Sequence, residues 1–290
     1  MVAVRHLGLL LLLSSASASS AAAQAPEVRG VLHERLVLLL NPMGAEHQLR
    51  AGLRGRLGDP DALLFSGAHA EAGAVGYVSP VYAIHGGYLQ VSPLAFLVLR
   101  AEMTGTAMWP IGMDGAGYYP VDGYDGDVSA EQLPGHAGET AGGWNLTVAA
   151  TLQGLVPLGP ARLLIWNETQ LGHVTLGDAP YFYSLKHDLI LAGRDWVLEN
   201  DALLLAELAL SADVGFRFGA YDSLRFVPAS GYLGHQVGPV LMLTFERPSE
   251  EVTRVEIFVR GGWYTDHVLR QDELTTLGVV SVTYDLGRVR

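Results

Sequence analysis

Two pairs of neighbouring residues have the side-chain types that acid–base chemistry uses. His187–Asp188 and Asp266–His267 each place an imidazole beside a carboxylate, and a histidine next to an acid can act as a general base. Adjacent side chains on a strand point to opposite faces, so neither pair forms a dyad by itself. Rim catalysis would require a histidine and an acid from different strands to converge, and we assign no catalytic residue.

A second group of residues could bind a cation through carboxylate oxygens. The stretch "DGYDGD" and a nearby glutamate supply Asp122, Asp125, Asp127 and Glu131, which have the ligand chemistry that Ca²⁺ prefers. Their spacing matches no EF-hand loop, and acidic runs are usually solvated. The histidines show no H-E-x-x-H or paired metal spacing. We therefore expect neither a bound metal nor a cofactor.

The largest polar group consists of charged residues that recur at every second position. In "AELALSADVGFRFGAY" (206–221) the even positions are all apolar, whereas Glu207, Asp213 and Arg217 occupy odd positions. Successive side chains of a strand alternate between its faces, so this pattern predicts one apolar and one charged face. The charged face that this alternation predicts comprises Arg50, Arg54, Arg56, Arg100, Glu102, Glu207, Asp213, Arg217, Glu256 and Arg260.

The elements that carry these residues are strands, since the period of two recurs along the chain and no helix-period segment of similar length occurs. Twelve strands are predicted, at 28–40, 46–57, 62–75, 80–91, 94–107, 144–156, 161–173, 186–197, 203–219, 232–246, 252–267 and 274–288. No apolar run after the leader is long enough to form a transmembrane helix. The sequence thus predicts an all-β fold.

The connections between the predicted strands fall into two classes. After the second strand every other connection is short, namely "GDPD", "VSP", "PLGPA", "ENDA" and "RPSEE". The alternate connections include the segment 108–143, "TLGDAPYFYSLKH" and "AYDSLRFVPASG". Short turns at one end and long loops at the other are typical of up-and-down outer-membrane barrels. We expect 108–143 to be a long extracellular loop.

The N-terminal 25 residues have the features of a secretory signal peptide. Arg5 precedes the apolar run "LGLLLLL", and "AAAQA" offers a cleavage site after Ala25. Loss of Arg5, the only charge in this leader, changes the formal net charge from -12 to -13. Such acidity argues against nucleic acid as a partner. Cysteine is absent, so packing and hydrogen bonds must stabilise the exported domain, residues 26–290.

The leader, the twelve alternating segments, the two classes of connection and the final "GVVSVTYDLG" together resemble bacterial outer-membrane β-barrel proteins. The resemblance is to the class and indicates no subfamily. It implies a transmembrane up-and-down antiparallel barrel of about twelve strands in the outer membrane of a Gram-negative bacterium. Outer-membrane lipid would then be a partner, with Leu208, Leu210, Val214, Phe216 and Phe218 facing it and the charged set lining the lumen.

Three functions and one different location are compatible with these features. The leading hypothesis is a narrow, porin-like channel for small solutes or a structural barrel, and not an enzyme. The first alternative is an outer-membrane hydrolase with a rim site that uses His187, Asp188, Asp266 or His267. The second is a soluble exported β-barrel or sandwich with its apolar side inward. The sequence does not indicate selectivity or oligomeric state.

Overall fold

The computed structural model of the chain describes residues 27–41, 43–59, 61–110, 117–124, 139–159, 161–267 and 270–289. The predicted signal peptide and most of the predicted calcium ligands lie outside the described residues. Within them, no helix is long and apolar enough to cross a membrane. The one helical segment they contain is the short 3₁₀ turn η1 (Leu63–Phe65).

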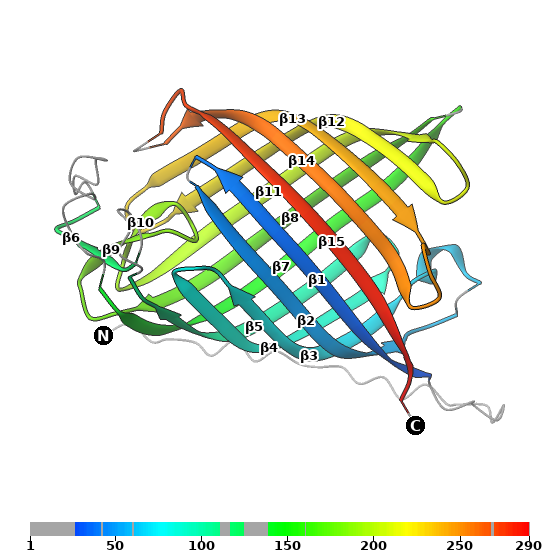
Figure 1. Ribbon diagram of the computed structural model, residues 1–290, viewed down its shortest axis with the longest axis horizontal. Helices are drawn as coiled ribbons and strands as arrows, with labels where there is room; N and C mark the ends of the chain where they lie inside the picture. The colour runs from blue at the N-terminus through cyan, green and yellow to red at the C-terminus, as the bar shows by residue number, and fades with distance from the viewer. Residues whose placement is uncertain are drawn as a thin grey trace, which may run out of the picture.

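Twelve antiparallel strands close into a barrel (Figure 1), which confirms the predicted fold class and strand number. The strands are β1 (Val28–Leu40), β2 (Gly44–Arg56), β3 (His69–Val78), β4 (Tyr82–Leu94), β5 (Leu97–Met108), β7 (Ala141–Leu158), β8 (Ala161–Leu176), β11 (Arg194–Ala209), β12 (Val214–Val227), β13 (Tyr232–Glu246), β14 (Val252–Asp266) and β15 (Leu274–Arg288). Each strand pairs with the next along the ring, and β15 pairs with β1 to close it. Closure leaves no unpaired strand edge, which is the condition for strands to cross a bilayer.

Three of the predicted strands, 62–75, 186–197 and 203–219, are placed wrongly. β3 begins only at His69, and the predicted short turn "GDPD" is part of a longer connection, 57–68, that contains η1. The stretch 206–221 is a hairpin, because β11 ends at Ala209 and β12 begins at Val214. A turn of four residues preserves the parity of the alternation, so even positions face outward on both strands and the pattern does not reveal the turn. Conversely, "ENDA" (199–202) is not a turn but the centre of β11. Its acidic residues face inward.

The two ends of the barrel differ as predicted, with some corrections. Both termini of the described chain lie at one end of the barrel, where Val289 N–H donates to the carbonyl of Val28 (3.0 Å). Four of the connections at this end are short: 95–96, 159–160, 210–213 and 247–251. At the opposite end the connections 109–140 and 177–193 are long. The predicted loop "AYDSLRFVPASG" is mostly strand, since β12 continues to Val227. We call the end with long connections the mouth.

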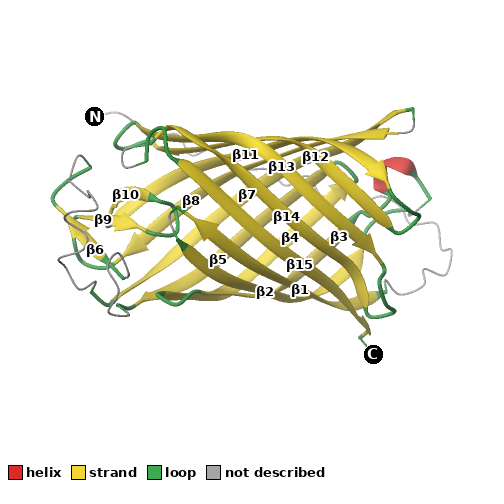
Figure 2. Ribbon diagram, turned by 45° about the horizontal axis from the view of Figure 1, so that its top comes forward, coloured by secondary structure: helices red, strands yellow, loops and turns green. Residues whose placement is uncertain are grey.

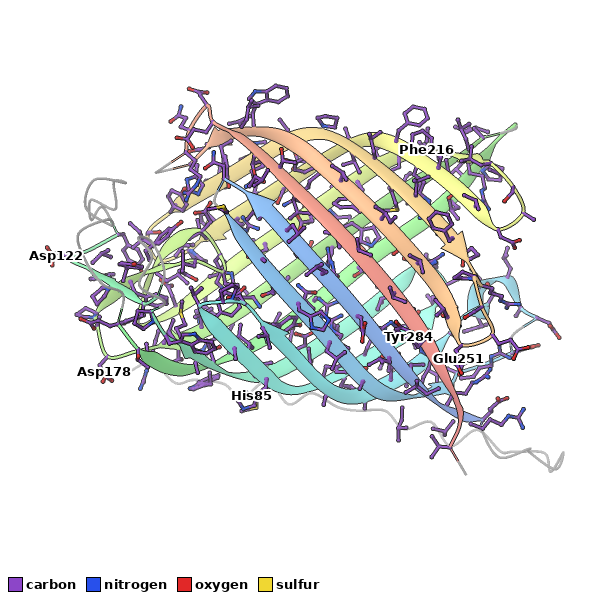
Figure 3. All side chains as sticks on the ribbon, viewed as in Figure 1. His85, Asp122, Asp178, Phe216, Glu251 and Tyr284 are labelled. Atoms are coloured by element: carbon purple, nitrogen blue, oxygen red, sulfur yellow. The ribbon has the colours of Figure 1, made fainter. Side chains whose placement is uncertain are left out.

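The outer surface of the wall is apolar, which confirms the predicted direction of the alternation. Leu208 on β11 and Phe218 on β12 are 40% and 42% exposed, whereas Glu207, on the opposite face of β11, is only 1% exposed. Figure 3 shows Phe216 on the outer side of the barrel. Aromatic residues near the mouth fall into two groups. Exposed rings on the mouth half of the wall are Trp144, Trp196 and Trp263, whereas the buried ones are Tyr118, Tyr119, Phe182, Tyr183, Tyr221 and Tyr264.

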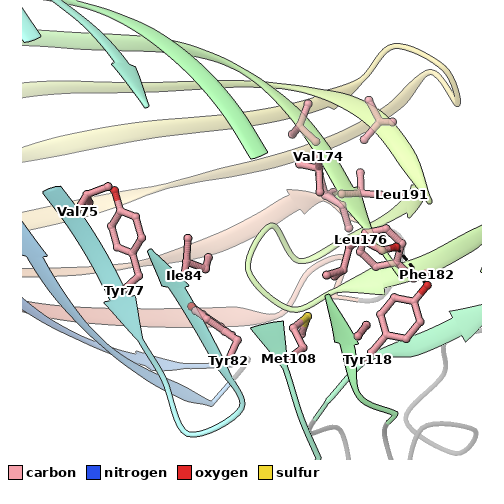
Figure 4. Packing of buried hydrophobic residues seen from close by; sticks show 14 of the residues in the cluster. Val75, Tyr77, Tyr82, Ile84, Met108, Tyr118, Val174, Leu176, Phe182 and Leu191 are labelled. Atoms are coloured by element: carbon pink, nitrogen blue, oxygen red, sulfur yellow. Dashed lines mark hydrogen bonds between the residues drawn. The ribbon is translucent and has the colours of Figure 1, made fainter. Parts of the chain in front are cut away.

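A small second sheet covers the mouth. Its strands are β6 (Tyr119–Val121), β9 (Tyr181–Ser184) and β10 (Leu189–Ala192), and Figure 2 shows them together at one end of the barrel. Phe182, Leu189 and Leu191 are at most 1% exposed and belong to one apolar cluster with residues of the inner wall, including Val197 and Val227. Figure 4 shows Phe182 and Leu191 of the cap near Val174 and Leu176 of β8. We call the segment 177–193 the cap.

Candidate functional site in the barrel lumen

Ion pairs between strands that are not neighbours show which face of the wall is the inside. Arg50 on β2 donates to Glu102 on β5 (Nη2–Oε1 2.7 Å), although β3 and β4 lie between these strands. Arg100 on β5 likewise reaches Glu168 on β8 (3.2 Å). Such pairs can form only across the concave side of a curved sheet. These side chains therefore project into the lumen.

The inward charged residues form a belt around the waist of the barrel. Arg50, Glu102, Glu168 and Asp201 lie at the middle of β2, β5, β8 and β11, respectively. Arg260, one position from the middle of β14, approaches Asp201 across two intervening strands (3.7 Å). We call the set Arg35, Arg50, Arg100, Glu102, Glu168, Asp201 and Arg260 the waist.

Charge is separated around the waist. Arg35, Arg50 and Arg260 come from β1, β2 and β14, on one arc of the ring. The acidic members come from β5, β8 and β11, on the opposite arc, where Arg100 of β5 pairs with Glu102 (3.1 Å) and Glu168 (3.2 Å). One arc therefore carries only arginines, and the other carries three acids and one arginine. Within the low-dielectric wall this unequal distribution creates a field directed across the lumen.

Two waist residues are accessible to water inside the wall. Arg35 lies on the inner face of β1, two positions after His33, whose ring contacts Arg54 and Thr283 on the two flanking strands. It is nevertheless exposed, and the side chain of Asp201 is 43% exposed. A residue inside a closed wall is exposed only where side chains leave space for water.

Most of the predicted charged residues lie on the inner face. Arg56 and Asp213 are the two exceptions. Arg56 is the exposed last residue of β2. Asp213 is a correction, since it lies in the exposed turn between β11 and β12 and not on a strand face. The inner-face residues outside the waist are Arg54, Glu207, Arg217 and Glu256.

A second ionic cluster lies below the waist, toward the end with short turns. The Glu207 carboxylate is 1% exposed and accepts from Arg217 (Nε–Oε2 2.5 Å) on β12 and from Arg162 on β8. Arg217 also approaches Glu256 on β14 (3.8 Å). These pairs join β8, β11, β12 and β14, four of five consecutive strands, and contribute to the rigidity of the wall.

The sequence prediction missed three members of the waist. Arg35 follows the alternation of β1, where it shares a face with His33, and could have been found from that parity. Asp201 was hidden because "ENDA" resembles a turn, although its alternation continues that of β11. Glu168 gives no separate signal in the sequence. Only closure of the ring places it opposite β1.

The rim residues form a buried clamp and not an exposed cleft. Asp188 lies in the turn between β9 and β10, with a left-handed backbone (φ 55°). Its carboxylate accepts from Tyr264 (3.0 Å) and Arg270 (3.0 Å) and lies 3.1 Å from His267 Nε2. The Asp188 and His267 side chains are only 6% and 2% exposed. His187 pairs instead with Glu199 (3.0 Å).

This clamp ties the cap to another part of the rim. The cap connects β8 to β11, whereas Tyr264 and Arg270 belong to β14, three strands from β11, and to the loop that follows it. Burial raises the pKa of Asp188, but the hydrogen bond from His267 and the charge of Arg270 outweigh it and hold this pKa below its ordinary value. The carboxylate is therefore ionised at neutral pH. A cavity of about 10 Å³ beside it has room for about one water.

The described residues give no support for a metal site. No group of three His, Asp or Glu side chains in them could hold a metal ion. Asp122 is described, but Asp125, Asp127 and Glu131 lie in the segments that the structure leaves out. The calcium hypothesis is thus untested by the structure.

Comparison with known proteins gives structural neighbours but no family. No family model matches the chain, and no curated protein matches it. The chain is similar to the NanC porin (10% identity, 87% of this chain and 98% of that chain, TM-score 0.39). It is also similar to the translocator domain of the autotransporter NalP from Neisseria meningitidis (11% identity, 91% of this chain and 90% of that chain, TM-score 0.44). A third neighbour is OmpT, an outer membrane protein of Vibrio cholerae (9% identity, 89% of this chain and 96% of that chain, TM-score 0.35).

These likenesses concern the barrel, and at such identities no ligand or activity transfers from them. The class of the protein follows from its own wall. A closed antiparallel ring with an even number of strands, an exposed apolar outer face and a charged inner face is the architecture of transmembrane β-barrels of the outer-membrane type.

Proposed function

We propose that the protein is an integral outer-membrane protein that forms a narrow channel for small solutes. The observation that carries this proposal is the exposed waist. Arg35 and Asp201 are open to water inside a wall whose outer face is apolar. A side-chain-filled structural barrel would bury its inward residues, as this barrel does at Glu207. The channel's partners are the surrounding lipid and the solutes that enter the lumen.

The cap makes the described conformation a closed one. Leu189, Leu191 and Phe182 pack into the mouth, and Asp188 holds the cap to the rim at β14. Passage of solutes therefore requires the cap to move away from the wall. Since the clamp depends on one carboxylate, substitution of Asp188 is the simplest way to favour the open form.

Conductance in planar lipid bilayers tests this function. We expect the purified, refolded protein to give rare or small single-channel steps, and the Asp188→Asn variant to give more frequent ones. Glu251→Gln, in an exposed turn at the other end (Figure 3), is the matched control and should behave as the parent chain. Absence of steps from all three folded proteins would exclude the channel and leave a structural barrel.

A second candidate function, lipid hydrolysis, is favoured by one contact on the outer face. His235 on β13 lies between Asp222 on β12 (Nε2–Oδ2 3.0 Å) and Thr265 on β14 (Nδ1–Oγ1 2.5 Å). An acid, an imidazole and a hydroxyl in sequence can activate the hydroxyl as a nucleophile. Release of fatty acid from mixed micelles by the purified protein, and its loss in His235→Ala, would support this function. Equal rates with and without protein would exclude it.

A further inference from the structure

Arg35 differs from the other arginines of the waist because it has no partner. Arg50 is held by Glu102 (2.7 Å) and Tyr77 (3.1 Å), and Arg260 lies over the ring of Tyr221 (4.6 Å) and near Asp201. In the part of the chain that the structure describes, Arg35 makes no hydrogen bond or ion pair. Its guanidinium is exposed to the lumen.

Two like charges act on Arg35. Arg50 and Arg260 repel it, and the opposing attraction comes from Glu46 and Glu168. Arg50 is fixed by its own carboxylate and phenol contacts, so it does not move away from Arg35. An unpaired guanidinium between two other cations is a point of high positive potential. An anion that enters the lumen is attracted to this point.

The inner surface between Arg35 and Arg260 is partly apolar. Val37 is two positions further along β1 and is half-buried, and it pairs with Glu46 on β2 and with the buried Val279 on β15. Phe258 on β14 pairs with Val279 and is half-buried as well. Val37 and Phe258 therefore offer accessible hydrocarbon between Arg35 and Arg260, with Glu46 on the other side of Val37. The basic arc of the waist therefore combines a free guanidinium with a hydrocarbon surface.

We propose that Arg35, with Arg50 and Arg260 around it and Val37 and Phe258 nearby, binds small organic carboxylates that pass through the lumen. The planar guanidinium donates two parallel hydrogen bonds to a carboxylate, and the half-buried Val37 and Phe258 contact the hydrocarbon part of the same solute. An inorganic anion uses only the charge and gains nothing from the apolar surface. This inference rests on the proposed channel for its biological role, but the binding itself does not require conduction.

Equilibrium binding to the folded barrel in detergent micelles tests the site directly, with butyrate and inorganic phosphate as probes. We expect butyrate to bind more tightly than phosphate, and Arg35→Gln to weaken butyrate binding by about tenfold. Arg194→Gln removes the same charge from an exposed position at the mouth end of β11, so we expect it to leave binding unchanged. Val37→Ser, at a half-buried inner position, should weaken butyrate binding and leave acetate binding nearly unaffected.

Each result has a distinct meaning. Equal loss of butyrate binding in Arg35→Gln and Arg194→Gln would overturn the site, because the effect would then be one of net charge. Phosphate binding as tight as butyrate binding would overturn the assignment to organic carboxylates. If butyrate binds at Arg35 but no variant conducts, the inference stands and the proposed channel fails. If Asp188→Asn conducts but butyrate neither binds nor blocks it, the channel stands and the inference fails.

Discussion

Arg35 and Glu168 lie on opposite sides of the barrel, because β1 and β8 are six strands apart in either direction around the ring of twelve. Both occupy mid-strand positions, and they are coupled electrostatically. The waist therefore has a basic side and an acidic side. This relationship determines which changes should alter ion preference and which should alter only stability.

Removal of the acidic side should make the channel prefer anions. Glu168 contacts Arg100 (3.2 Å) and Thr151 (2.8 Å), and Glu168→Gln leaves a neutral side chain of the same size there. In Asp188→Asn as the conducting parent, we expect the zero-current potential in a KCl gradient to shift toward the chloride value. Glu246→Gln, in the wall near the short turns, should shift it less. A shift toward potassium would contradict the transverse field.

Acidification should open the cap through Asp188. The folded-state pKa of this carboxyl is depressed, so its contribution to the clamp is complete above the ordinary value of 3.8 and is lost as the pH falls through the lower folded value. We expect conductance to rise only below about pH 4. The Asp188→Asn channel should lack this rise. An identical acid response in both proteins would assign the opening to other groups.

Removal of the buried Glu207 should destabilise the barrel. Glu207→Gln leaves Arg217 and Arg162 without their shared carboxylate in a nearly inaccessible position. Breaking a buried ion pair in this way costs about 3 kcal/mol, and we expect that loss in urea unfolding followed by tryptophan fluorescence. The exposed-turn change Glu251→Gln should lie within about 0.5 kcal/mol of the parent. A similar small effect of Glu207→Gln would mean that the cluster adds little to stability.

A charge on the outer face should disfavour the folded barrel in lipid. Leu204 is 53% exposed on the outer side of β11, and an arginine near the middle of the bilayer costs about 2–4 kcal/mol. Leu204→Arg should therefore lower folding yield and stability in lipid vesicles. Leu210→Arg, in the neighbouring turn, should have little effect. If Leu204→Arg folds as well as the parent, the apolar face does not contact lipid.

The alternation of side chains was sufficient to predict the wall. A period of two specifies which residues share a face wherever a strand continues, so the apolar outer face of β5 and the inward direction of Arg100 and Glu102 followed from the residues alone. The same rule failed at 206–221, because a four-residue turn keeps the parity and conceals the hairpin. It also failed at "ENDA", where lumenal acids resemble the polar residues of a turn.

The functional relationships depend on closure of the ring, which no local pattern encodes. Glu168 opposes Arg35 because five strands lie between β1 and β8 on each side of the ring. Neither histidine of the two neighbouring pairs contacts the acid beside it in the sequence. His187 pairs with Glu199, and His267 pairs with Asp188. Sequence alone determined a barrel with an apolar exterior and a charged interior. Only the tertiary structure decided which charges meet, which arginine has no partner and what covers the mouth, since these depend on strand order and register across the whole ring.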